Sequence, residues 1–160
     1  MDEKTVFLSI AGPDSALAAE ARTAVSIAAY GTGSTEFAVE LRSFKAWDLN
    51  SPALYTASLR IDDDTEIKSY PFGIREARFD GASGFILNGR QIKLKGVNVH
   101  HDAGTIGAAV PPGFWRRRLE ALKELGCNAI RCAHSPQAPE LYELCDEMGF
   151  LVIDEFTDRW

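Results

Sequence analysis

The pattern of hydrophobic and polar positions divides the chain into two halves. Up to about residue 76, apolar residues occur in short and partly alternating runs between turns rich in glycine and aspartate. Alternation of this kind is typical of half-buried β-strands. The predicted strands are 5–10, 23–30, 35–41 and 54–61. The alanine-rich stretch 16–24 is compatible with a helix, but we assign it to a strand. Several short strands at this spacing predict an antiparallel sandwich.

From Phe79 onward the pattern changes to alternating strands and helices. Residues 84–94 read as two strands around an Asn88-Gly89 turn, which is a strong signal of a β-hairpin. After the hairpin we predict strands at 95–99, 128–132 and 150–154 and helices at 114–125 and 139–148. Alternating strands and helices predict a parallel sheet with right-handed crossovers. Because a closed barrel needs eight strands, these three would form only its opening part.

Each of the three predicted parallel strands ends in ionisable residues. These residues are His100, His101 and Asp102 after the first strand, Arg131 and His134 at the second, and Asp154 and Glu155 at the third. The carboxyl ends of parallel strands face the same way, so we expect these side chains to converge on one rim. Such a rim is typical of an active site. From the residues alone, a structural cluster of satisfied hydrogen bonds is an equal alternative.

Composition and charge argue against several classes of partner. The chain has 160 residues and a net charge of −6, which does not favour nucleic acid or an anionic membrane surface. No apolar run approaches the roughly 18 residues of a membrane helix. The alanine-rich stretch lacks the basic start of a signal peptide. Cys127, Cys132 and Cys145 form no Cys-x-x-Cys pair, so we expect reduced thiols in the core.

Metal binding is the main competing interpretation of the polar residues. A catalytic zinc site could be assembled from His100, His101, Asp102 and His134. Their spacing, however, matches no standard zinc motif. The acidic run 62–64 could suggest calcium, but consecutive carboxylates on a loop are more often solvated. We therefore predict neither a metal nor a cofactor.

The chain resembles glycoside hydrolase family 2, the β-galactosidase-like family, over nearly its whole length. The segments that carry the resemblance are Trp47–Tyr55, Phe72–Arg75, Phe85–Gly89, Lys95–His100, Asn128–Pro136 and Leu144–Glu155. Each motif is weak alone, but their order and spacing together are specific. The resemblance implies an immunoglobulin-like β-sandwich over 1–76, lacking its first strand or strands. It further implies the first three βα units of a (β/α)8 TIM barrel over 77–160, which leaves the barrel incomplete.

The resemblance also implies a reaction, the retaining hydrolysis of a β-linked glycoside by an O-glycosyl hydrolase. Two carboxyl groups about 5–5.5 Å apart carry out this chemistry. In the family they are glutamates after barrel strands four and seven, so we expect the present chain to lack both and to be inactive alone. Asp154 and Glu155 are a poor substitute, because neighbours on a strand point to opposite faces.

Several substrates and roles stay open. The run His100–Gly104 favours a β-galactosidase, while β-glucuronidase and β-mannosidase are alternatives within the family. A non-catalytic carbohydrate-binding or assembly subunit is the alternative from a different class. The expected partner is a β-linked oligosaccharide or glycoside. The apolar strand at 151–153 would leave an unpaired edge, which also predicts self-association.

The resemblance assigns roles to individual residues. The substrate-binding residues that it implies are His100, His101, Asp102, His134, Glu155 and Trp160. Arg131 and His134 would support the absent catalytic carboxylates, Arg131 by keeping the nucleophile ionised. A structural ion pair is the alternative for Arg131. Some family members hold magnesium through Glu and His just past strand three, but residues 156–160 here do not match those ligands.

Overall fold

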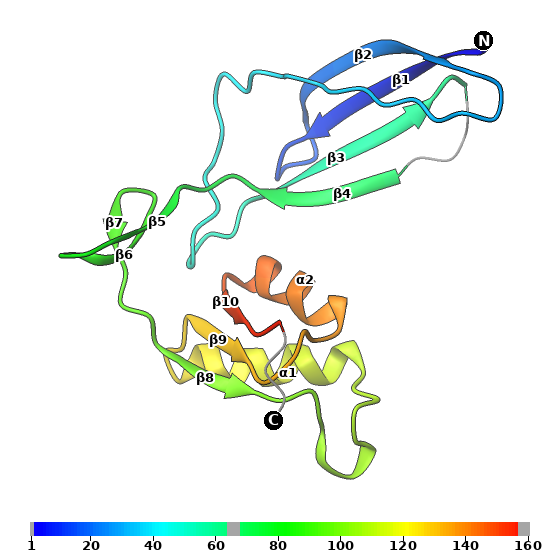
Figure 1. Ribbon diagram of the computed structural model, residues 1–160. Helices are drawn as coiled ribbons and strands as arrows, with labels where there is room; N and C mark the ends of the chain where they lie inside the picture. The colour runs from blue at the N-terminus through cyan, green and yellow to red at the C-terminus, as the bar shows by residue number, and fades with distance from the viewer. Residues whose placement is uncertain (1, 64–67, 157–160) are drawn as a thin grey trace. The chain divides into compact units, whose positions relative to one another are not determined.

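The computed structural model describes residues 2–63 and 68–156, and its internal contacts divide the chain into two compact units (Figure 1). Unit 1 comprises Met1–Lys45 and Ala53–Ile74. Unit 2 comprises Ala46–Pro52 and Arg75–Trp160. None of the helices in the described ranges is long and apolar enough to cross a membrane.

Unit 1 contains an antiparallel sheet of four strands in the order β2-β1-β3-β4. Its strands are β1 (Asp2–Ala11), β2 (Leu17–Ile27), β3 (Leu54–Ile61) and β4 (Lys68–Gly73). The strand assignment of the alanine-rich stretch is confirmed, because β2 pairs with β1 along nearly its whole length. In register, Ile10 faces Ala19 and Ala57, which places the three residues on one apolar face of the sheet.

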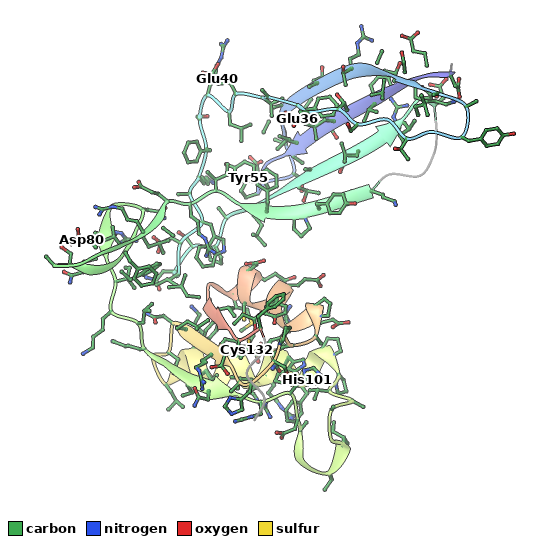
Figure 2. All side chains as sticks on the ribbon, in the orientation of Figure 1. Glu36, Glu40, Tyr55, Asp80, His101 and Cys132 are labelled. Atoms are coloured by element: carbon green, nitrogen blue, oxygen red, sulfur yellow. The ribbon has the colours of Figure 1, made fainter. Side chains whose placement is uncertain are left out.

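The predicted strand at 35–41 is wrong, although its burial pattern is right. Phe37, Val39 and Leu41 are half-buried while the intervening residues, including Glu36 and Glu40, are exposed. Figure 2 shows this segment as an extended chain without strand pairing. Alternation of buried and exposed side chains requires only that one side of the segment packs against the protein. A β-strand also requires hydrogen bonds to a neighbouring backbone. Residues 2–63 and 68–156 provide no such neighbour for this segment. The second sheet of a sandwich therefore stays a prediction.

Unit 2 contains a small antiparallel sheet in the order β5-β6-β7. It is built from β5 (Ala77–Asp80), β6 (Gly84–Leu87) and β7 (Arg90–Gln91). Asn88 and Gly89 have φ angles of 49° and 75°, the positive values that a two-residue type I′ turn requires. The predicted hairpin is thus confirmed, although its second strand is shorter than we expected.

The rest of unit 2 is a parallel sheet with two helices. The strands β8 (Gly96–Val99), β9 (Ala129–Cys132) and β10 (Leu151–Asp154) lie in the order β10-β9-β8. A 3-10 turn, η1 (Gly104–Ile106), and the helix α1 (Pro112–Glu124) follow β8, and α2 (Pro139–Met148) follows β9. Proline at the start of each helix supplies the fixed φ of the first helical turn. These elements and their parallel pairing match the sequence prediction.

The two faces of the parallel sheet differ. One face packs against α1 and α2 in a core formed by Val99, Trp115, Leu119, Ile130, Cys132, Leu141, Leu144, Cys145 and Phe150. Asn98, Arg131 and Ile153 share a register row and lie on the other face. Ile153 is 51% exposed, so this open face has no apolar cover among the described residues.

Residues 46–52, here called the strap, pack within unit 2, although they lie inside the predicted sandwich range 1–76. The Trp47 side chain is 1% exposed, and its Nε1–H donates to the Asp146 carbonyl at 2.7 Å. The Lys123 ammonium donates to the carbonyls of Leu49 (2.9 Å) and Gly149 (2.8 Å). The last carbonyls of a helix have no intrahelical partner. The strap and Lys123 therefore satisfy the carboxyl end of α2.

The strap also binds the β6–β7 hairpin. Asn88 donates from its side-chain amide to the Trp47 carbonyl at 2.9 Å, and Arg90 forms an ion pair with Asp48. Burial disfavours ionisation of Asp48, but hydrogen bonds from the Arg90 side chain and from the main-chain N–H of Asn50 outweigh it and lower the pKa of this carboxyl. The strap is thus fixed by contacts that are distant in sequence.

Candidate functional site

The ends of the parallel strands bring four predicted site residues together on the open face. His100 follows β8, Arg131 and His134 belong to β9 and its end, and Glu155 follows β10. The Arg131 guanidinium pairs with one oxygen of Glu155 and donates to Asn98 Oδ1 at 3.2 Å. His134 Nδ1 lies 3.0 Å from the other Glu155 oxygen. The His100 ring meets the His134 ring edge-on, with 5.6 Å between centroids. We call these four residues with Asn98 the polar cluster.

The hydrogen bonds of the polar cluster determine what it offers to a ligand. An ionised carboxylate only accepts, so His134 Nδ1 carries the hydrogen that points to Glu155. In neutral His134 the outer nitrogen is then an acceptor. The His100 ring makes no hydrogen bond to any described residue and lies exposed at the edge of the cluster. Acceptors, donors and ring faces placed together in this way suit a polyhydroxylated ligand.

The two carboxylates at the end of β10 diverge, as alternation along a strand requires. Glu155 joins the polar cluster, whereas Asp154 accepts a hydrogen bond from the Tyr142 hydroxyl of α2 at 2.9 Å. Their directions and partners prevent them from acting on one bond from two sides. Residues 2–63 and 68–156 therefore hold no acid and nucleophile pair at the strand ends.

The structure does not bring His101 and Asp102 into the polar cluster. His101 packs its ring 5.5 Å from that of Trp115, and its Nδ1 lies 3.1 Å from Oε1 of Gln137 (Figure 2 labels His101). Asp102 is exposed, and its main-chain carbonyl accepts from Arg118 at 3.0 Å. His101 directly follows His100, so the two side chains leave the strand end in different directions. Trp160 lies outside the described residues.

Sequence reasoning missed three polar residues near the site. Asn98 lies two positions before His100 and opposite Arg131 in register, so alternation along the strand could have identified it. Gln137 and Tyr142 contact residues of other elements, and their local sequence gave no signal of this. Gln137 is only 8% exposed and is the one buried polar side chain in the part of the chain that the structure describes.

The metal interpretations gain no support from the geometry. Within residues 2–63 and 68–156, no group of three or more His, Cys, Asp or Glu side chains could hold a metal ion. His101 faces Gln137, so the suggested zinc ligands point apart. In the acidic run, Asp62 accepts from the Thr5 amide and pairs with Lys4, and Asp64 lies outside the described residues.

The three thiols are free, as expected, and two of them lie in the core. Burial raises the pKa of Cys132 to about 11 and that of Cys145 to about 12. Both therefore remain protonated near neutral pH, and a thiol is a poor nucleophile in that form. Cys127 is half-buried. The buried pair belongs to the packing of α2 and the sheet, not to a reactive centre (Figure 2 labels Cys132).

Parallel strands with helices packed on one face and ionisable residues at the strand ends are an arrangement found in α/β barrels. The family model "Glycosyl hydrolases family 2, TIM barrel domain" matches residues 80–158. Beta-galactosidase BoGH2A of Bacteroides ovatus is 50% identical over 117 residues, which cover 71% of this chain and 14% of that protein.

Solved structures agree with the sequence comparison. A glycosyl hydrolase family 2 member from Bacteroides cellulosilyticus has a TM-score of 0.90 at 32% identity. The match covers 99% of this chain and 21% of the chain of that protein. The beta-glucuronidase of Parabacteroides merdae has a TM-score of 0.84 at 28% identity. That match covers 98% of this chain and 20% of the chain of the glucuronidase. The chain belongs to glycosyl hydrolase family 2, and it spans a small part of these relatives.

Proposed function

We propose that the chain is the opening part of a retaining β-glycosidase and that its polar cluster lines the sugar-binding site. Unit 1 would be part of an immunoglobulin-like sandwich, and β8, β9 and β10 with their helices would be the first three βα units of the barrel. The observation that carries the proposal is the convergence of His100, Arg131, His134 and Glu155 on the open face. Relatives of this chain are named as enzymes that act on β-linked glycosides.

The polar cluster supports sugar binding more directly than bond cleavage. Glu155 has one oxygen occupied by Arg131 and the other by His134, so it is held as a positioned carboxylate. The acid and the nucleophile of a retaining glycosidase must lie about 5–5.5 Å apart on either side of the bond. We infer that these two groups belong to later strands of a complete barrel. The chain alone is then inactive.

The charge arrangement favours a neutral sugar. A β-glucuronidase must bind a carboxylate on the sugar ring, and a free cation is the natural partner for that group. The guanidinium of Arg131, the cation of the polar cluster, already contacts Asn98 and Glu155. It is therefore occupied by the protein. This supports a β-galactoside as the substrate, with a β-glucuronide as the alternative to be tested.

A chimera tests the proposed function. The 160-residue chain would replace the corresponding segment of beta-galactosidase BoGH2A, and hydrolysis of chromogenic β-galactoside and β-glucuronide would be measured. We expect the chimera to prefer the galactoside and the isolated chain to show no turnover. His134→Ala should lower kcat/KM of the chimera by about 100-fold, the size of effect that loss of substrate positioning causes.

The matched control is Glu143→Ala, which removes an exposed carboxylate from α2 and should leave kcat/KM unchanged. Equal kcat/KM values for the two variants would show that His134 does not take part in substrate binding. A chimera that prefers the glucuronide would overturn the assignment of the sugar. Turnover by the isolated chain would show that the carboxylates of later strands are dispensable. Specific binding of galactose by the isolated chain, with an inactive chimera, would instead favour a carbohydrate-binding subunit.

A further inference from the structure

A second set of hydrogen bonds lies beside the polar cluster and joins all three strand ends. It contains His101 after β8, Gln137 in the loop after β9, Tyr142 on α2 and Asp154 at the end of β10. The three contacts measure 3.1 Å, 2.7 Å and 2.9 Å in that order. We call these four residues the rear network.

The proton positions in the rear network follow from its chemistry. The Ser135 carbonyl can only accept, so the side-chain NH2 of Gln137, 2.8 Å away, faces it. The amide oxygen of Gln137 therefore faces His101, and His101 Nδ1 must donate to it. The main-chain N–H of Gln137 donates to the Tyr142 hydroxyl, which donates in turn to the Asp154 carboxylate. Every donor in this series has an acceptor.

The rear network is positioned to hold one loop. Gln137 is 8% exposed and makes three hydrogen bonds, one from its main chain and two from its side chain. These bonds fix residues 133–138, the loop that carries His134. Burial raises the pKa of Tyr142 to about 12, so its hydroxyl keeps its proton and remains able to donate. The network is part-buried around Gln137 and exposed at Asp154. Satisfied hydrogen bonds around a buried polar side chain such as Gln137 make a structure rigid.

We propose that Gln137 and Tyr142 are positioning residues, which fix loop 133–138 and so hold His134 at hydrogen-bonding distance from Glu155. This inference rests on the proposed role of the polar cluster in sugar binding. Within the described residues the His134 side chain makes one hydrogen bond, to Glu155, so its position also depends on the backbone that carries it. The rear network supplies that constraint from the helix-covered side of the sheet.

The test is a double-mutant cycle in the BoGH2A chimera. Tyr142→Phe, which removes only the hydroxyl, should lower kcat/KM for the galactoside about tenfold, because small displacements of positioned groups are costly. In a His134→Ala background the same substitution should change kcat/KM less than twofold. Residues that act through a shared group are not additive, whereas a purely structural effect would persist in both backgrounds. Gln137→Met, similar in shape but without the amide, should behave as Tyr142→Phe does.

Tyr70→Phe is the matched control, because Tyr70 is 53% exposed in unit 1, and it should have no effect. Equal losses from Tyr142→Phe with and without His134 would overturn the positioning role while leaving the proposed function intact. An inactive parent chimera would instead defeat the proposed function. Hydrogen exchange of the 160-residue chain then decides the inference. Tyr142→Phe should speed exchange in 133–138 and leave the β6–β7 hairpin unchanged, and a uniform change would overturn it.

Discussion

The two faces of the β8–β9–β10 sheet use the same short strands for different purposes. On the helix-covered face, Ile130 and Cys132 are 1% and 0% exposed and belong to a continuous apolar core. On the open face, Arg131 lies between them in sequence and contacts Asn98 and Glu155. Because successive side chains of a strand point to opposite faces, neighbouring residues serve either the core or the polar cluster. Substitutions one residue apart on these strands should therefore affect different properties.

The largest expected effect on stability comes from the core face. Leu141→Ala on α2, where Leu141 is fully buried, should reduce the free energy of unfolding by about 2–5 kcal/mol. The loss combines the removed apolar contacts with the cavity that remains. Denaturant titration measures it. Ile153→Ala on the open face is the matched control and should cost less than about 1 kcal/mol, because half of its surface is already exposed. Similar losses would mean that the two faces are not distinct.

A second effect concerns the end of α2. Gly149 has φ of 72°, and a side chain there would collide with the Leu49 carbonyl of the strap. Gly149→Ala should therefore cost about 1–3 kcal/mol of unfolding free energy, measured by thermal or chemical denaturation. Gly126→Ala is the control, because φ there is 83° but the surrounding space is open. The difference in unfolding free energy between the two variants measures the cost of the collision with the Leu49 carbonyl. Equal costs would show that backbone strain alone is responsible.

A smaller effect is expected at alkaline pH. Cys145 has its pKa raised from 9.0 to about 12 in the folded chain, so the unfolded chain loses this proton first as the pH rises. The unfolded state then binds fewer protons, and the free energy of unfolding falls above about pH 9. Comparison with Cys145→Ala subtracts the pH dependence that other titrating groups contribute to the stability of both proteins. The variant should lose less stability than the parent between pH 8 and 11. Parallel curves would contradict the assigned burial of this thiol.

The smallest expected effect on stability lies on the open face. Arg131→Ala should change the free energy of unfolding by only about 0–1 kcal/mol, because partly exposed ion pairs contribute little. In the BoGH2A chimera, by contrast, we expect kcat/KM to fall at least tenfold, since Glu155 loses one of its two partners. Denaturation and kinetics of one variant therefore separate the two properties. A large loss of stability with unchanged kinetics would reverse the roles assigned to the two faces.

The sequence predicted well what depends on local spacing. The helix expected at 139–148 matches α2, because Pro139 and Gly149 mark its ends and Leu141, Leu144 and Cys145 mark its buried side. The Asn88-Gly89 turn and the three parallel strands were predicted for similar local reasons. The family resemblance is also correct. At the site, convergence of His100, Arg131, His134 and Glu155 followed from the shared direction of parallel strands.

The missed features depend on contacts between distant residues. Residues 35–41 show the alternation of a strand, but alternation cannot reveal whether a second backbone lies alongside. Trp47 falls inside the predicted sandwich range 1–76, but it belongs to unit 2, where its side chain donates to the carbonyl of Asp146. The role of Gln137 is apparent only from the folded structure, where it forms hydrogen bonds with His101 and Tyr142. A polar residue in a loop gives no sign in its own sequence that it will be buried.

The strap has a consequence for how such a protein can be recombined. The chain enters unit 2 at residue 46, returns to unit 1 at residue 53 and enters unit 2 again at residue 75. A gene fragment that starts at the boundary of the matched family segment, residue 80, would leave behind the residues that cover the end of α2. Exchange of this domain between relatives therefore requires two separate stretches of coding sequence to be inherited together. Surviving recombinants should keep both stretches from one parent.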